Sequence, residues 1–126
     1  MTLYINTASQ AETVIALIVN NKKIVSKKFK FAHRQAEKLL PAIDKLLKAN
    51  KFKLANIEKI MVASYGGSFT SLRIGVVTAN ALGYALKVPV ISEETGKADK
   101  VFAGYSLIEP VYDSEPNIGQ PKKSIF

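Results

Sequence analysis

The order of apolar and polar positions changes along this chain, and its first stretch has the pattern of β-strands. Apolar runs lie at 3–5, 12–19 and 24–31, and an Asn-Asn-Lys turn signal at 20–22 separates the second run from the third. The run at 12–19 is apolar on both faces, as in a central strand, whereas phenylalanine alternates with lysine near the end of the third run. Alternation with a period of two is typical of a half-buried strand, and lysine at a sheet edge discourages further pairing. The pattern predicts an antiparallel meander of three strands, with the third strand at an edge.

Helical periodicity begins after these strands. From 34 to 49 the apolar positions are three and four residues apart, which predicts a helix with one apolar face. Pro41 lies inside this segment and lacks an amide hydrogen, so we expect a kink there or a loosened first turn. A strand at 59–63, a second helix from about 69 to 86 and a strand at 87–91 follow, and the β-α-β connection makes these two strands parallel. The predicted fold class is α/β, with three antiparallel strands and then α-β-α-β in a mixed five-stranded sheet.

The last part of the chain is less regular. Residues 93–106 are mostly polar, and we expect one short helix there at 98–103. Residues 107–126 contain prolines and glycine at short intervals, which favours an extended segment. The predicted organisation is a single lobe at 1–106 and an extended C-terminal tail at 107–126.

Composition narrows the class of protein. The chain has 126 residues, a hydrophobic content of 48% and no cysteine. This length is enough for one domain with its own core, and the lack of cysteine excludes disulfides, thiolate metal sites and cysteine catalysis. No apolar run approaches the roughly 18 residues of a membrane span, and the first residues lack the pattern of a signal peptide. We therefore expect a cytoplasmic protein.

The net charge of +8 raises the question of nucleic acid. Lysine supplies nearly all of the positive charge, because the only arginines are Arg34 and Arg73. Arginine makes the bidentate and stacking contacts that specific recognition uses. A lysine-rich surface is therefore either a solvated face or a site of weak, salt-sensitive contact with nucleic acid.

A glycine turn joins the fourth predicted strand to the second helix. Gly66 and Gly67 lack a Cβ, so the backbone can turn sharply and approach a neighbour. Ser68 or Thr70 can cap the new helix, and the free amides of its first turn, together with Arg73, can hold an anion. The stretch has neither the Gly-Lys-Ser/Thr ending of phosphate loops nor the spacing G-x-G-x-x-G. It is a candidate anion contact, or a tight turn in which Arg73 fixes the loop.

Small residues recur on the second helix at every fourth position, at Gly75, Ala79 and Gly83. A glycine costs a helix roughly 1 kcal/mol relative to alanine, so close approach of another backbone is the expected reason for them. The strip packs either on its own sheet and the first helix or on a partner subunit. In the second case the interface residues are Leu72, Gly75, Val76, Ala79 and Gly83 of the second helix, with Leu39 and Ile43 of the first.

Catalytic chemistry has little support in the sequence. His33 is the only histidine, and one histidine cannot form the usual multi-histidine metal site. Ser68 and Thr70 have no imidazole base other than His33, and the carboxylates show no pair spaced for acid–base work. The sequence therefore predicts no catalytic, cofactor-binding or metal-binding residue, and we expect the histidine to cap or pack the start of the first helix.

Three ordered segments resemble the TsaB (YeaZ) family. GGSFTSLRIG at 66–75 is similar to its G-P-G-S-F-T-G-L-R-I-G segment, LYINTA at 3–8 resembles its opening strand and Asp-Thr-Ser turn, and HRQAEKLLPAIDKLL at 33–47 is similar to its HS-x-x-L-L-P-x-I helix. PVYDSEP at 110–116 also looks like the family's P-x-Y-x-x-E-P tail. The main resemblance covers about residues 1–92 and implies a ribonuclease-H-like half-domain of the actin/Hsp70/sugar-kinase superfamily.

The resemblance implies a role in tRNA modification. The family is the non-catalytic partner of the TsaD enzyme, which makes threonylcarbamoyladenosine in tRNA. It implies a scaffold subunit that forms a heterodimer with a TsaD-like protein and, through that complex, meets a TsaE-like ATPase. The same helices would form a homodimer of the chain alone. Because a full-length relative continues into a second lobe, we infer an internal deletion after Ser92 that keeps the family's tail.

Several positions depart from the family pattern. Asn6 stands where this superfamily commonly has an aspartate, Ser71 replaces a glycine, and Tyr65-Gly66 replaces Gly-Pro. An amide has neither charge nor basicity, so Asn6 argues against phosphoryl transfer and is expected to bond the turn backbone. One alternative to the scaffold is a nucleotide-binding or phosphotransfer fragment of the superfamily. The second alternative is a lysine-rich tRNA-binding module.

Overall fold

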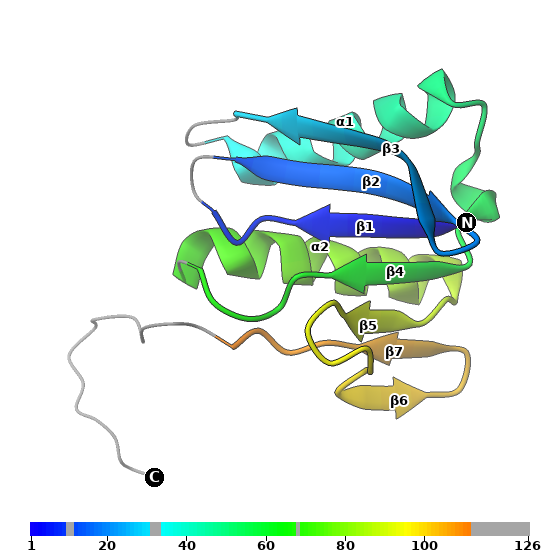
Figure 1. Cartoon of the computed structure of the whole chain (residues 1–126). Helices are drawn as coiled ribbons and strands as arrows, with labels where there is room; N and C mark the ends of the chain where they lie inside the picture. Colours follow the sequence, from blue (N-terminus) through cyan, green and yellow to red (C-terminus); the bar gives the residue numbers. More distant parts are fainter. Residues whose placement is uncertain (10–11, 31–33, 68, 112–126) are drawn as a thin grey trace, which may run out of the picture.

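The structure, a computed structural model, describes residues 1–9, 12–30, 34–67 and 69–111, with the backbone alone at 69. His33, Ser68 and most of the expected tail lie outside these residues, together with the roles predicted for them. The elements are β1 (Thr2–Asn6), β2 (Thr13–Val19), β3 (Lys22–Phe29), α1 (Gln35–Ala49), a 3₁₀ turn η1 (Leu54–Asn56), β4 (Lys59–Val62), α2 (Phe69–Leu86), β5 (Val90–Ser92), β6 (Lys100–Phe102) and β7 (Tyr105–Leu107) (Figure 1).

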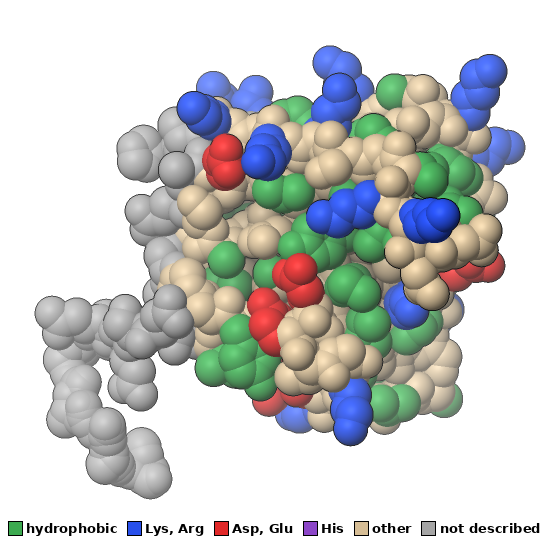
Figure 2. Space-filling view, in the orientation of Figure 1, with side chains coloured by type: hydrophobic (Ala, Val, Ile, Leu, Met, Phe, Trp, Pro, Cys, Tyr) green, Lys and Arg blue, Asp and Glu red, His purple; other side chains and the backbone are tan. Residues whose placement is uncertain are grey.

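The main sheet has the predicted topology. Its strand order is β3-β2-β1-β4-β5, with β1 antiparallel to β2 and parallel to β4, and with β4 parallel to β5. β3 is antiparallel to β2 and forms one edge, as its lysines predict. Both helices lie on the same side of the sheet (Figure 1), and Figure 2 shows the other face, where hydrophobic side chains lie between lysines. The prediction of an α/β fold with a mixed five-stranded sheet is confirmed.

The Asn-Asn-Lys turn closes the hairpin of β2 and β3. Asn20 and Asn21 have φ angles of 53° and 64°, and Val19 pairs with Lys22 on either side of them. A two-residue loop with positive φ at both positions matches the twist of the strands, and asparagine tolerates this conformation. The local sequence is therefore enough to set the register of this hairpin.

The core lies between the sheet and the two helices. Leu3 and Ile5 on β1, with Ile60 and Val62 on β4, have no exposed surface. Side chains alternate across a strand, so one face of each strand supplies this core. α1 adds its apolar stripe and continues through Pro41, which lies on its exposed side. Within the described residues, neither helix combines the length and the apolar character that crossing a membrane requires.

The segment after β5 is a hairpin, and the helix expected at 98–103 is wrong. β6 and β7 form a two-stranded antiparallel sheet in which Phe102 pairs with Tyr105. Gly104 in the intervening turn has a φ of 87°, a left-handed conformation that glycine adopts without strain and that a helix excludes. Each strand has only three residues, so the alternation is too short to indicate a strand in the sequence.

One buried side chain joins this hairpin to the main sheet. The Ser106 hydroxyl accepts a hydrogen bond from the Val90 amide at 2.6 Å and donates one to the Val90 carbonyl at 2.9 Å. Ser106 is 3% exposed, so these bonds satisfy polar groups that would otherwise be costly to bury. The contact joins residues 16 positions apart, and it favours an extended β7 over a helix.

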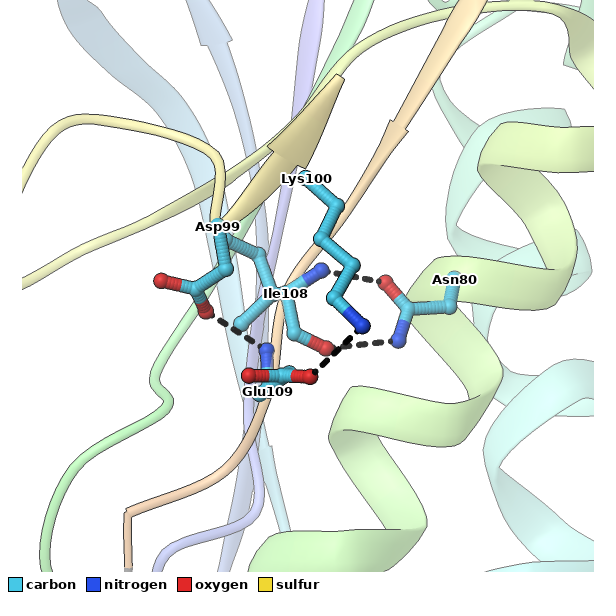
Figure 3. A network of polar contacts seen from close by, with 5 residues as sticks. All are labelled: Asn80, Asp99, Lys100, Ile108 and Glu109. Atoms are coloured by element: carbon cyan, nitrogen blue, oxygen red, sulfur yellow. Dashed lines mark hydrogen bonds and ion pairs between the residues drawn. The ribbon is translucent and has the colours of Figure 1, made fainter. Parts of the chain in front are cut away.

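α2 holds the chain that follows β7. Asn80 donates from Nδ2 to the Ile108 carbonyl at 2.8 Å and accepts the Ile108 amide at Oδ1 at 2.9 Å (Figure 3). The Glu109 amide donates to Asp99 Oδ2 at 2.6 Å, and the Glu109 carboxylate lies 3.3 Å from the Lys100 ammonium. Ile108 is 2% exposed. β7 and Ile108 thus pack with the lobe, although both reach past the boundary expected between lobe and tail.

Candidate functional site

The strip of small residues on α2 faces its own sheet. A Cβ at Gly75 would lie 2.4 Å from Thr7 Oγ1, and a Cβ at Gly83 would lie 2.3 Å from Val90 Cγ2. Ala79 has no exposed surface. Interiors are close-packed, so the missing Cβ atoms let α2 approach the end of β1 and β5. The small residues therefore pack α2 on its own sheet, which is the first of the two explanations that the sequence offered.

The predicted partner interface needs correction for the same reason. All seven of its residues are buried inside the lobe: Leu39 and Ile43 on α1, and Leu72, Gly75, Val76, Ala79 and Gly83 on α2. Side chains this deeply buried cannot form the contact surface for a folded partner. The sequence of α2 is apolar nearly all round, so its pattern does not distinguish a face that meets the sheet from a face that meets another protein.

Thr7, which the sequence analysis did not single out, ties β1 to α2. Its Oγ1 donates to the Ser71 carbonyl at 2.5 Å and accepts the Gly75 amide at 3.0 Å. In a regular α-helix these two groups bond to each other. Thr7 is fully buried, so its hydroxyl fixes the first turn of α2 against the end of β1. The only sequence signal is a threonine directly after the first strand.

The outward side of the helix pair carries accessible apolar surface. Leu40 on α1 is 51% exposed and Val77 on α2 is 55% exposed. A groove of about 410 Å³ lies on this side, lined by Ala36 of α1 and by Thr70, Arg73, Ile74, Val77 and Thr78 of α2. The groove combines apolar walls with one cation, and it is the candidate site for another protein.

The glycine turn is occupied by the chain itself. Gly66 and Gly67 have φ angles of 73° and 78°, as the predicted sharp turn requires. The Gly66 amide donates to the Val111 carbonyl at 2.8 Å, so an anion would have to displace this bond. Thr70 and Arg73, the other described residues of the predicted anion contact, line the helical groove. Among the described residues, the lining of that groove thus includes Thr70 and Arg73 but neither glycine of the turn.

A polar cluster lies at the carboxyl ends of β4 and β5. Glu94 Oε1 accepts from the Ser64 amide at 3.0 Å and from the Ser92 hydroxyl at 3.1 Å, and the two serine hydroxyls lie 2.7 Å apart. Ligands of open α/β sheets bind at such strand ends. Here a carboxylate of the chain already uses the donors, and its charge opposes a phosphate. This geometry does not favour the nucleotide alternative.

Asn6 has the structural role that was expected. Its Oδ1 accepts the Ala8 amide at 2.9 Å, and its Nδ2 donates to the Tyr4 hydroxyl at 3.1 Å. Tyr4 donates in turn to Glu93 Oε1 at 2.7 Å. Burial, and then this hydrogen bond to Glu93, raises the pKa of the Tyr4 phenol well above its usual value. In the described part of the chain, no three acidic or histidine side chains gather as a metal site would need.

Comparisons with known proteins identify the family. Residues 13–98 match the family model described as TsaD: tRNA N6-adenosine threonylcarbamoyltransferase. The tRNA threonylcarbamoyladenosine biosynthesis protein TsaB of Buchnera aphidicola subsp. Acyrthosiphon pisum (strain APS) is 31% identical over 90 residues, which are 70% of this chain and 41% of that protein. TsaB of Bacillus subtilis (strain 168) is 38% identical over 79 residues, which are 60% of this chain and 34% of that protein. The chain thus spans less than half the length of these curated relatives.

Solved structures agree with the sequence comparisons. YeaZ from Pseudomonas aeruginosa superposes with a TM-score of 0.66 and 25% identity, over 72% of this chain and 42% of that one. A second structure, of an uncharacterized protein with similarity to peptidase YeaZ from Pseudomonas aeruginosa, matches with the same score and identity. This likeness confirms the ribonuclease-H-like half-domain. The chain belongs to the family that the TsaD model describes and, within it, to the TsaB (YeaZ) proteins of tRNA threonylcarbamoyladenosine biosynthesis.

Proposed function

We propose that this chain is a scaffold subunit that binds a TsaD-like enzyme and supports N6-threonylcarbamoyladenosine formation in tRNA without catalysing it. One structural observation supports this role: the helix pair carries a groove lined by Val77, and Leu40 of α1 is exposed as well. Apolar surface on a folded domain is typical of protein interaction sites. The interface lies on the outward side of α1 and α2, because their inward residues pack on the sheet.

The proposal extends to the assembly. A TsaE-like ATPase meets the chain through the complex, and the chain alone forms a homodimer through the same groove. The protein acts in the cytoplasm, where it finds its partner and tRNA. We keep the division into a lobe at 1–106 and a C-terminal tail at 107–126 as part of the proposal, with most of a second lobe lost after Ser92, although Leu107 and Ile108 pack with the lobe. β6 and β7 add no strand to the main sheet, which agrees with that interpretation.

The nucleotide-binding alternative has less support. The Glu94 carboxylate occupies the donors at the strand ends, and the Gly66 amide is bonded to the chain. Asn6 bonds the backbone of its own turn. Saturable ATP binding in calorimetry would favour this alternative over the scaffold.

The test compares two valine-to-aspartate variants. Val77→Asp puts a charge beside the groove, and Val101→Asp puts the same charge on β6, where Val101 is 78% exposed. Both positions are open to solvent, so neither change buries a charge in the free chain. Light scattering on a size-exclusion column, with a TsaD-type protein, should show a complex for the wild type and Val101→Asp and none for Val77→Asp.

Two results would contradict the proposal at different levels. Equal binding by both variants would move the interface away from this groove. A wild-type chain that forms no complex, even with tRNA and ATP present, would count against the scaffold role itself.

A further inference from the structure

β3 and the segments that flank it in sequence carry positive charge without a carboxylate among them. No aspartate or glutamate occurs between Glu12 and Glu37. The lysines of this interval are Lys22, Lys23, Lys27, Lys28 and Lys30, and all five are exposed. The Lys23 ammonium lies 5.3 Å from the centre of the Tyr4 ring, and the other four form no ion pair with a described residue. Their charge is available to a ligand.

Protection of the sheet edge explains only part of this pattern. Lysine on an edge strand prevents pairing with another chain. Here the register also places Lys23 and Lys28 on the sheet face that carries no helix, whereas Lys27 pairs with Ile15 on the face toward the helices. Figure 2 shows lysine and arginine side chains gathered over the upper strands, and most acidic side chains lie lower. Neighbouring like charges repel each other and create a positive potential that attracts a polyanion.

We propose that the β3 edge binds the phosphate backbone of RNA. Lysine is a compact point charge that contacts phosphate without reading base sequence. At about 3.3 Å per residue, the row from 22 to 30 is about 26 Å long, enough to follow several phosphates of one strand. The inference rests on the proposed function, because tRNA modification supplies the RNA. The inference names the surface of this subunit that contacts the RNA.

The RNA surface and the partner surface lie on different parts of the molecule. The groove lined by Val77 belongs to α1 and α2, which lie on one side of the sheet (Figure 1). The register places Lys23 and Lys28 on the other side. Binding of tRNA and binding of a TsaD-like protein can therefore be changed one at a time. That separation makes failure of one proposal distinguishable from failure of the other.

The experiment measures tRNA binding by two triple variants with equal loss of charge. Lys23, Lys28 and Lys30 are changed to glutamine in the first, and Lys38, Lys45 and Lys51, exposed on and just after α1, are changed to glutamine in the second. Fluorescence anisotropy with labelled tRNA is recorded from about 50 to about 200 mM salt. If each lysine meets one phosphate, the slope of log K against log salt becomes shallower by about 2–3 in the first triple, at about 0.7–0.9 per contact.

The second triple should keep the affinity and slope of the wild type within about twofold. Equal weakening of both triples would overturn the proposal, because net charge alone would then explain binding. A wild-type chain that binds phosphatidylserine vesicles but not tRNA would overturn it too, in favour of a membrane surface. The first triple should still form the complex with the TsaD-type protein, and a monodisperse elution profile confirms that it is folded.

Discussion

The hydroxyl of Thr7 lies between two backbone groups of α2 and bonds to both, and Gly75 is what makes room for it. Thr7 Oγ1 accepts the Gly75 amide at 3.0 Å, while any Cβ at Gly75 would come within 2.4 Å of that oxygen. Insertion of a side chain into the helical ladder joins the start of α2 to the end of β1 more closely than apolar packing would.

Gly75→Ala should therefore destabilise the lobe although alanine favours helices. We expect a loss of about 1–3 kcal/mol in the free energy of unfolding, as for other overpacked cores. The double variant Thr7→Ala with Gly75→Ala removes the oxygen that the new methyl group meets and frees the Gly75 amide for the Ser71 carbonyl. Urea unfolding should show that the double variant costs less than the sum of the two single changes. Additive costs would mean that the two residues do not interact.

The buried phenol of Tyr4 should make stability depend on alkaline pH. Its pKa is higher in the folded protein than the ordinary value of about 10, because burial and the bond to Glu93 favour the neutral form. The folded state keeps this proton longer, so the contribution of Tyr4 is full below about pH 10 and is lost as the pH rises toward the folded-state pKa. The stability difference between wild type and Tyr4→Phe should shrink between about pH 9 and about pH 11 in urea unfolding. A constant difference would contradict the role of this phenol.

Asn80 should hold the chain after β7 through its amide group. Asn80→Asp keeps an acceptor for the Ile108 amide but turns a second acceptor toward the Ile108 carbonyl (Figure 3). We expect a loss of about 1–3 kcal/mol and faster hydrogen exchange at the Ile108 amide. Asn56→Asp is the matched control, because within the described residues the Asn56 side chain bonds through its Oδ1, which accepts the Lys53 amide. Similar exchange at Ile108 in both variants would contradict the prediction.

Glu94 should contribute to stability rather than to catalysis. Glu94→Ala leaves the Ser64 amide and the Ser92 hydroxyl without their acceptor, so we expect a loss of about 1–2 kcal/mol. Glu37→Ala, which among the described residues breaks the exposed ion pair with Arg34, should stay within about 0.5 kcal/mol of wild type in the same thermal unfolding experiment. A larger loss at Glu37 than at Glu94 would reverse this assignment.

The candidate site shows where sequence reasoning stops. The pattern predicts an interface on the helix pair, but the residues it marks on α2 lie on the face that meets the sheet. Gly75 and Gly83 signal a close approach, and only the neighbours Thr7 and Val90 show that the approach is to the lobe's own sheet. The exposed face, with Val77 and Arg73, contains no small-residue periodicity that would have marked it.

Local order along the chain determined most of the fold. The Asn-Asn turn, the alternation of lysine and phenylalanine and the helical stripe of α1 each involve residues within a few positions of one another, so propensity and periodicity suffice. Tertiary structure alone decided the hairpin of β6 and β7, which Ser106 holds to Val90, and the direction in which α2 presents its glycines. Those outcomes depend on contacts between distant residues, which no short window of sequence contains. The free energy of these contacts outweighs the weak local preferences.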